Sequence, residues 1–513
     1  MTASLPRPEP DPSVLESLAR ELAAPHLAPV VDLVAYPVKD ADRSSVVVRN
    51  AGGAVRLWLT DAGQEQHEVL TGRDPVGRTD PMAFLPYRLE QADPSPDNER
   101  NAYPDPARRL LSFFADADRS PDLVVVHTPR HYFPEAGGHR GEHGSLDVIQ
   151  SRAPFLLSGP GIEAAGAVAG HARTVDVAPT LLHLAGVGEE FHRDGDGRPL
   201  DGRARTDLAV AGAGQFVIGL LWDGAHCSDL LHLAATGELP AVARLLAAGT
   251  ALTGGAVAEF PSVTLCNHTS ALTGVGPGRH GVLGNIFYDR RQEERILAND
   301  ETTWHRSAEW LRPSVATVFE MLDRAQPGVV TACLNDPIDR GATISTMRLV
   351  RSQGGENGAR DLAAVLPPAE RSPYLGQPSH LTNRYYRWCT QVDDAGLTQV
   401  LELFADPTRK AHWPRLTWWS AIVTDAGHHG GGPRSLVARD SLRDADRRLG
   451  ALLAHFDRLG LTDQVTFLLT ADHGFEAADE TVTGSWAPTL DAACRRLGVA
   501  YRDEGPGFIY LTR

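Results

Sequence analysis

Three aspartates follow continuous apolar runs of the sequence, and two of them have histidines close by. They are Asp223 in QFVIGLLWD, Asp425 with His429 in TDAGHHGGGP, and Asp472 with His473 in TADHG. Carboxylate oxygens and imidazole nitrogens suit zinc, and a cluster of them could hold one or two ions, with manganese or magnesium as alternatives. A single such aspartate is more often a cap or turn residue. Three together favour a metal site.

A hydrolytic metal site also needs an attacking group, and the segment EFPSVTLCNHTSALTG (259–274) contains several hydroxyl side chains. A Thr or Ser hydroxyl is a poor nucleophile until a metal lowers its pKa. A Pro-interrupted loop that runs into a helix is a suitable place for such a residue. From chemistry alone, Ser262, Thr264 and Thr269 are equivalent candidates.

Short apolar runs of the kind found in strands that are buried on both faces recur along the chain. They lie at 121–128, 153–159, 215–223, 329–335, 416–425 and 464–474. Helical patterns lie between several of them, at 174–187, 228–249, 317–326 and 441–460. This alternation predicts an α/β fold with a doubly wound, mostly parallel central sheet and helices on both faces. The three aspartates would then lie at the carboxyl ends of strands, where such sheets bind ligands.

The N-terminal region has a different pattern. Residues 1–13 are rich in Pro and lack periodicity, which predicts a disordered tail. The segment 15–27 has apolar residues at helical spacing, and RSSVVVRN with AVRLWLT predicts a hairpin around residues 51–53. Whether the region 44–90 packs on the main sheet or forms a small module of its own is left open by the sequence.

Composition limits the classes of partner. Among 513 residues, 65 are acidic and 49 are Lys or Arg, so the formal net charge is −16. A nucleic-acid polymer or an anionic membrane is therefore not expected as a partner, whereas a small anionic substrate is compatible with bound metal ions. No apolar run approaches the roughly 18 residues of a membrane helix, and the N-terminus does not resemble a signal peptide, so we expect a cytoplasmic protein. The five cysteines include no CxxC pair, which argues against a disulfide framework or a thiolate zinc site.

Taken together, these motifs resemble the alkaline phosphatase superfamily, in particular its branch of type I phosphodiesterases, nucleotide pyrophosphatases and phosphonoacetate hydrolases. The segment FPSVTLCNHTSALTGVGPGRHGVLGN (260–285) is similar to the nucleophile segment of that branch, and LLWDG, TDAGHHGGGP and TADHG are similar to its metal-binding motifs. The resemblance implies that Thr264 is the nucleophile. It also implies that Asn285 contacts the phosphoryl oxygen, together with the backbone N–H of Thr264 or Leu265.

The resemblance further implies two zinc ions. The second ion would be held by Asp223, Asp472 and His473, with Thr264 beside it, and the first by Asp425, His429 and a further histidine. In the family that histidine follows the Asp-His-Gly motif, but no histidine follows His473 in this chain.

An upstream segment supplies a candidate for the missing ligand. GGHRGEHGSLDVIQ (137–150) resembles the Gly-x-His-Gly-Ser motif that closes these enzymes, and it places His143 as the last ligand, with His139 as the competitor. The chain thus resembles a circular permutation: 14–205 is similar to the C-terminal part of the family fold and 215–513 to its N-terminal part. We expect 206–214 to be a linker, about 286–415 to be an inserted cap, and both segments to form one catalytic domain.

The expected activity is hydrolysis of a phosphodiester or pyrophosphate bond in a small, nucleotide-like or other anionic substrate. Two alternatives remain open. The same metal site could serve a phosphonate hydrolase or a phosphomonoesterase, or the permutation could have left a non-catalytic metal-binding protein.

Overall fold

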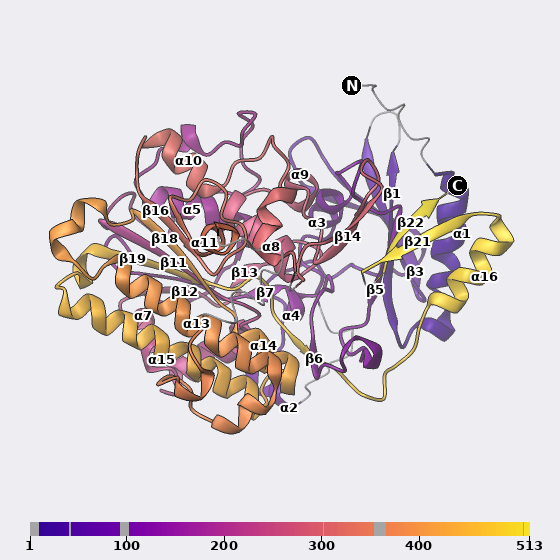
Figure 1. Cartoon of the computed structure of the whole chain (residues 1–513). Helices are drawn as coiled ribbons and strands as arrows, with labels where there is room; N and C mark the ends of the chain where they lie inside the picture. Colours follow the sequence, from indigo (N-terminus) through magenta and orange to yellow (C-terminus); the bar gives the residue numbers. More distant parts are fainter. Residues whose placement is uncertain are drawn as a thin grey trace.

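A computed structural model describes residues 10–39, 43–92, 102–300, 302–352, 366–505 and 507–512 (Figure 1). Most of the tail expected at 1–13 lies outside these ranges. Its last two residues, however, begin helix α1 (Pro12–Leu22), because the Asp11 carboxylate accepts a hydrogen bond from the Ser13 N–H and caps the helix. The prediction of disorder is therefore wrong for Pro12 and Ser13.

An eight-stranded central sheet forms the larger part of the fold (Figure 1). Its strands, in spatial order, are β17 (Ile344–Ser345), β16 (Thr331–Leu334), β18 (Leu416–Ala421), β11 (Phe216–Trp222), β19 (Val465–Thr470), β8 (Phe155–Ser158), β12 (Gly249–Leu252) and β9 (Gly166–Val168). The first five run parallel, and β8 runs antiparallel to both of its neighbours. The predicted mostly parallel sheet is confirmed, but 153–159 is not a parallel strand, because the chain enters β8 from the opposite end of the sheet.

Helices cover both faces of the central sheet (Figure 1). One face carries α5 (Val177–Leu184) and α10 (Val318–Ala325), and the other carries α7 (Pro240–Ala247), α13 (Arg384–Leu403) and α15 (Leu436–Arg458). The helical pattern at 228–249 forms two helices, α6 (Cys227–Ala235) and α7, because Gly237 adopts a positive φ of 81° and Pro240 begins the second helix.

Among the described residues, no single helix is long and apolar enough to cross a membrane. Within the described ranges, α6 and α7 together reach that length and composition, and they are bent by 87° relative to each other. In the fold, α7 packs against α15, β8 and β12.

A second sheet stands beside the first and is antiparallel throughout. Its seven strands are β21 (Ala500–Glu504), β22 (Phe508–Thr512), β5 (Leu123–His127), β1 (Val31–Lys39), β2 (Ser44–Asn50), β3 (Gly53–Leu59) and β4 (Glu65–Gly72). The predicted hairpin is present as β2 and β3, in this second sheet. The run at 121–128 also lies here, as β5, so its assignment to the parallel sheet is wrong. The continuous apolar run indicates a strand that is buried on both faces. Strand β5 is buried throughout in the second sheet as well, so the run does not distinguish the two sheets.

The region 286–415 is only partly an insert. It begins with a hairpin of β14 (Ile286–Asp289) and β15 (Glu294–Leu297), and it later supplies α13. Between these elements, β16 and β17 belong to the central sheet, with α10 beside them. The prediction of an inserted cap over the whole range is therefore wrong, since β16 and β17, between residues 331 and 345, belong to the central sheet.

Candidate metal centre

The three aspartates singled out by the sequence meet at one edge of the central sheet. Asp223 directly follows β11, Asp472 lies two residues after β19, and Asp425 lies in the first turn of α14 (Val423–Gly431), which follows β18. These strands are adjacent and parallel, so their carboxyl ends share an edge. All three side chains are buried.

One group of ligand atoms comprises His143, Asp425 and His429, whose candidate atoms all lie within 4.8 Å of one another. His429 Nε2 lies 3.4 Å from Asp425 Oδ1. The Nδ1 atoms of the two histidines contact backbone carbonyls, that of His143 the Ser262 oxygen at 3.0 Å and that of His429 the Gly141 oxygen at 2.9 Å. Each Nδ1 can donate to its carbonyl, which leaves Nε2 free to bind a metal.

A second group lies beside the first and involves Asp223, Asp472 and His473. His473 Nε2 is 3.2 Å from Asp472 Oδ2 and 3.8 Å from Asp223 Oδ1. Asp223 also belongs to a combination with Asp425 and His473 that could hold an ion. The His143 and His473 rings stack with centroids 3.7 Å apart, so the two groups are neighbours.

The chemistry of these side chains fits bound cations. Several of their buried atoms have no hydrogen-bond partner in the described part of the chain, namely Asp223 Oδ1, Asp425 Oδ1, Asp472 Oδ2 and His473 Nε2. Burying such polar atoms is costly unless something compensates them. A cation between the carboxylates and the imidazole nitrogens would do so.

Electrostatics leads to the same conclusion. Burial, followed by the charges of Asp472 and Asp425, raises the pKa of Asp223 well above its usual value. Burial and the neighbouring histidines lower the pKa of His143 well below its usual value, and that of His429 falls to about 3. The imidazoles are therefore neutral, which is the form that binds metal, and a positive charge would relieve the repulsion among the carboxylates.

The structure separates the three hydroxyl candidates. Ser262 Oγ donates to the Ser145 carbonyl at 2.8 Å, and Thr269 Oγ1 donates to the Leu265 carbonyl at 2.6 Å. Thr264 is the first residue of α8 (Thr264–Thr273), and its hydroxyl makes no hydrogen bond to any described residue. Four residues later on the same helix face, His268 Nε2 lies 3.6 Å from Asp472 Oδ2. Thr264 is thus the available hydroxyl.

Asn285 is tied to the same helix. Its Oδ1 accepts a hydrogen bond of 3.0 Å from the Leu265 N–H. The Leu265 N–H is therefore engaged by Asn285, and of the two backbone donors expected for a phosphoryl oxygen the Thr264 N–H remains. The contact orients the amide of Asn285, so that its Nδ2 and the Thr264 N–H are the remaining candidate donors.

Sequence reasoning missed several residues around this centre. His268, Asp223 and Asp472 form a further combination that could hold an ion, and His268 Nδ1 lies 2.8 Å from Asp336 Oδ2. Asp336 follows an apolar strand, as the three predicted aspartates do, so the same signal could have found it. Tyr385, whose hydroxyl contacts Asp425, follows no such pattern.

His139 and His143 lie in different candidate groups. His143 joins the group with Asp425 and His429, whereas His139 joins Glu142 and His429 in a separate combination. His139 Nδ1 lies 3.5 Å from Glu142 Oε1. His143 is the one that lies beside a carboxylate from the strand ends.

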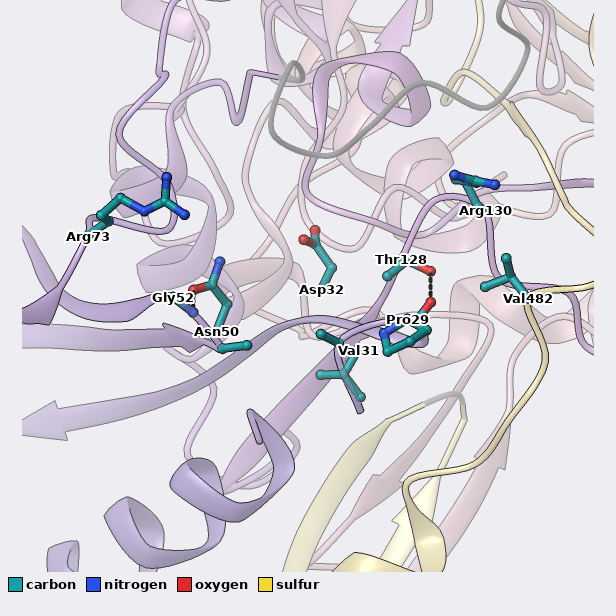
Figure 2. A pocket seen from close by; sticks show the side chains of 11 residues that line it. Pro29, Val31, Asp32, Asn50, Gly52, Arg73, Thr128, Arg130 and Val482 are labelled. Carbon is teal, nitrogen blue, oxygen red and sulfur yellow. Dashed lines mark hydrogen bonds between the residues drawn. The ribbon is translucent and has the colours of Figure 1, made fainter. Parts of the chain in front are cut away.

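A cavity of about 570 Å³ lies elsewhere in the molecule, near the second sheet (Figure 2). Asp32, Asn50, Arg73 and Arg130 are among its lining residues, and at one side Thr128 Oγ1 donates to the Pro29 carbonyl at 3.1 Å. None of the residues that line it belongs to the cluster at the strand ends. It is therefore separate from the candidate metal centre.

The fold and this centre define an α/β protein with a buried cluster of carboxylates and imidazoles that could bind metal ions. The family model of type I phosphodiesterase / nucleotide pyrophosphatase matches residues 217–506, which is more than half of the chain. The chain belongs to this family.

One solved structure with partial similarity is murine ectonucleotide pyrophosphatase / phosphodiesterase 5, an inactive variant in complex with AMP. The two sequences are 16% identical, and the match has a TM-score of 0.35 and covers 52% of this chain and 59% of that chain. Another is phosphonoacetate hydrolase from Sinorhizobium meliloti 1021 in complex with phosphonoformate, at 22% identity and a TM-score of 0.32 over 51% of this chain and 57% of that one. The match thus spans less than two thirds of either structure.

Proposed function

We propose that the protein is a metal-dependent hydrolase of phosphodiester or pyrophosphate bonds, with Thr264 as nucleophile and two zinc ions. The observation that carries the proposal is the grouping of uncompensated, buried carboxylate and imidazole atoms. The helix that begins with Thr264 contacts this group through His268, which lies 3.6 Å from Asp472. Family membership supports the same class of reaction. The substrate we propose is a small anionic phosphoester, because a net charge of −16 disfavours binding of a polyanion.

The proposed ligands are Asp425, His429 and His143 for one ion, and Asp223, Asp472, His473 and Thr264 for the other. The mixture of three imidazoles with carboxylates favours zinc over manganese or magnesium, which prefer oxygen ligands. When bound, zinc supplies Lewis-acid stabilisation of the charge on the attacking and leaving oxygens.

The residues of the chain itself have distinct roles in this proposal. The Thr264 oxygen forms a bond to phosphorus while the bond to the leaving oxygen breaks, the leaving group takes the bonding electrons, and the hydroxyl proton passes to solvent. The start of α8 lies at the attacking residue, where helix N–H groups favour an anion. Asn285 Nδ2 donates to a non-bridging oxygen. Water then cleaves the phospho-threonine and restores the hydroxyl.

The test combines metal analysis with a panel of p-nitrophenyl mono- and diesters, a dinucleotide and phosphonoacetate. We expect two equivalents of metal and a preference for diesters or the dinucleotide. A preference for monoesters or phosphonoacetate would favour the alternative hydrolase, and metal binding without turnover would favour a non-catalytic protein.

A matched pair of variants tests the nucleophile. Thr264→Val should lower turnover at least about 1,000-fold, because it removes the attacking oxygen. It should lower the metal content only slightly, because Asp223, Asp472 and His473 remain to hold that ion. Thr269→Val removes a hydroxyl of the same helix that is already hydrogen-bonded to the backbone, and it should retain turnover. Activity retained in Thr264→Val would overturn the assignment.

We also propose that the chain is a circular permutation of the family order. Both segments build the central sheet, since β8 and β9 come from 14–205 and β11, β18 and β19 from 215–513. Helix α1 packs on α16 (Ala487–Leu497), so the first described helix and the last one lie together beside the second sheet (Figure 1). A fragment of residues 215–513 lacks His143, two strands of the central sheet and five strands of the second sheet, so we expect it to be unstable or inactive. A stable, fully active fragment would contradict the permutation.

A further inference from the structure

Asp425 has two carboxylate oxygens in different surroundings. Its Oδ2 accepts a hydrogen bond of 2.8 Å from the Tyr385 hydroxyl. Its Oδ1 lies 3.4 Å from His429 Nε2 and has no hydrogen-bond partner among the described residues. The two oxygens of Asp425 therefore differ: Oδ2 is hydrogen-bonded to Tyr385, and Oδ1 is available to bind a metal.

The position of Tyr385 is itself well fixed. It is the second residue of α13, and its N–H donates to the side chain of the capping residue Asn383 at 2.8 Å. Its ring stacks on that of Trp388, with centroids 6.3 Å apart and the planes inclined by 17°. Trp388 in turn contacts the edge of Trp304. The backbone of Tyr385 is thus fixed by Asn383 and its ring by Trp388, and its hydroxyl contacts Asp425.

We propose that Tyr385 is a positioning residue for the metal centre, which holds Asp425 as a ligand through Oδ1 alone. This inference rests on the ligand set proposed above. Asp425 belongs to both cation groups, with His143 and His429 on one side and with Asp223 and His473 on the other. Without the phenol, the carboxylate could turn about its last bond and present either oxygen to either group. With it, the free oxygen stays beside His429.

Removal of a hydrogen bond to a metal ligand typically weakens metal binding by about 10- to 100-fold. Tyr385→Phe keeps the ring that stacks on Trp388 and removes only the hydroxyl. Tyr386→Phe is the matched control, because that neighbouring hydroxyl also donates at 2.8 Å to a buried carboxylate, that of Asp444 in α15. Asp444 is not among the proposed ligands.

The experiment is a competition titration of Zn²⁺ against a chelator, repeated with Co²⁺ so that the absorption spectrum reports the ligand geometry. We expect Tyr385→Phe to bind one of the two equivalents at least about tenfold more weakly and to change the Co²⁺ spectrum. Tyr386→Phe should bind both equivalents within about twofold of the wild type. Wild-type affinity in Tyr385→Phe, or an equal loss in Tyr386→Phe, would overturn the inference.

Two further measurements complete the test. Asp425→Asn should lose one metal equivalent. If it binds both normally, the proposed ligand set fails, whereas normal binding by Tyr385→Phe alone overturns only the role of Tyr385. In the wild type, metal loading should change the near-ultraviolet absorbance of tyrosine, and this readout does not depend on a variant that folds. An unchanged tyrosine signal would count against the inference.

Discussion

Asp336 connects helix α8 to the central sheet. It lies two residues after the end of β16 and is fully buried. Its Oδ2 accepts from His268 Nδ1 at 2.8 Å, Trp418 Nε1 at 2.8 Å and Ser420 Oγ at 2.7 Å, and its Oδ1 accepts from the Ile338 N–H at 2.9 Å. Burial acts to raise the pKa of Asp336, but the charge of His268 and these hydrogen bonds outweigh it and hold that pKa below its usual value.

The substitution Asp336→Asn keeps the shape of the side chain, removes its charge and replaces one carboxylate oxygen by an amide nitrogen. Even with the amide oxygen turned toward the three side-chain donors, the nitrogen faces the Ile338 N–H, and the charged pair with His268 is lost. Each buried donor that loses its acceptor costs about 1–3 kcal/mol, and breaking a buried charged pair costs about 3–5 kcal/mol. We therefore expect the free energy of unfolding to fall by about 3–5 kcal/mol, a large part of the roughly 5–15 kcal/mol typical of proteins.

The assay is urea unfolding of the metal-free protein in the presence of a chelator, because bound metal would stabilise the folded state by itself. Ser420→Ala is the control, since it removes one donor and leaves the carboxylate with three. It should cost only about 1 kcal/mol. The reasoning is refuted if Asp336→Asn lies within about 1 kcal/mol of the wild type, or if Ser420→Ala costs as much.

Two other predictions concern the edge of the sheet and α13. Gly224→Ala would place a Cβ 2.3 Å from the Phe475 ring at a φ of +63°, so it should lower the metal content. The control is Gly237→Ala, which also has a positive φ (+81°) but open space around it, and which should keep the metal content. Equal losses of metal in the two variants would contradict this prediction. Burial raises the pKa of Asp393 to about 7, above the value of 3.8 expected in the unfolded chain. The folded state then binds its proton more tightly, so the free energy of unfolding should fall by about 4 kcal/mol as the pH rises from about 4 to about 7. Asp393→Asn should remove this dependence in urea unfolding at several pH values, and an unchanged pH profile would show that another group is responsible.

Much of the central sheet could be predicted because its strands are marked locally. A continuous apolar run identifies a buried strand, and an aspartate at its end identifies the edge where ligands bind, as for Asp223 and Asp472. Strand direction and membership of a sheet are not local properties. The run 153–159 forms an antiparallel strand and 121–128 joins the second sheet, because pairing partners far away in the chain decide both.

The sequence by itself determined which residue types could bind metal and which segments carry them. Only the tertiary structure decided which side chains meet. It distinguished His143 from His139, left the Thr264 hydroxyl free while Ser262 and Thr269 are hydrogen-bonded, and brought Tyr385 to Asp425. The physical reason is that hydrogen bonds and ligand geometry require contact within a few ångströms, and such contacts between distant segments exist only after the strands and helices have packed.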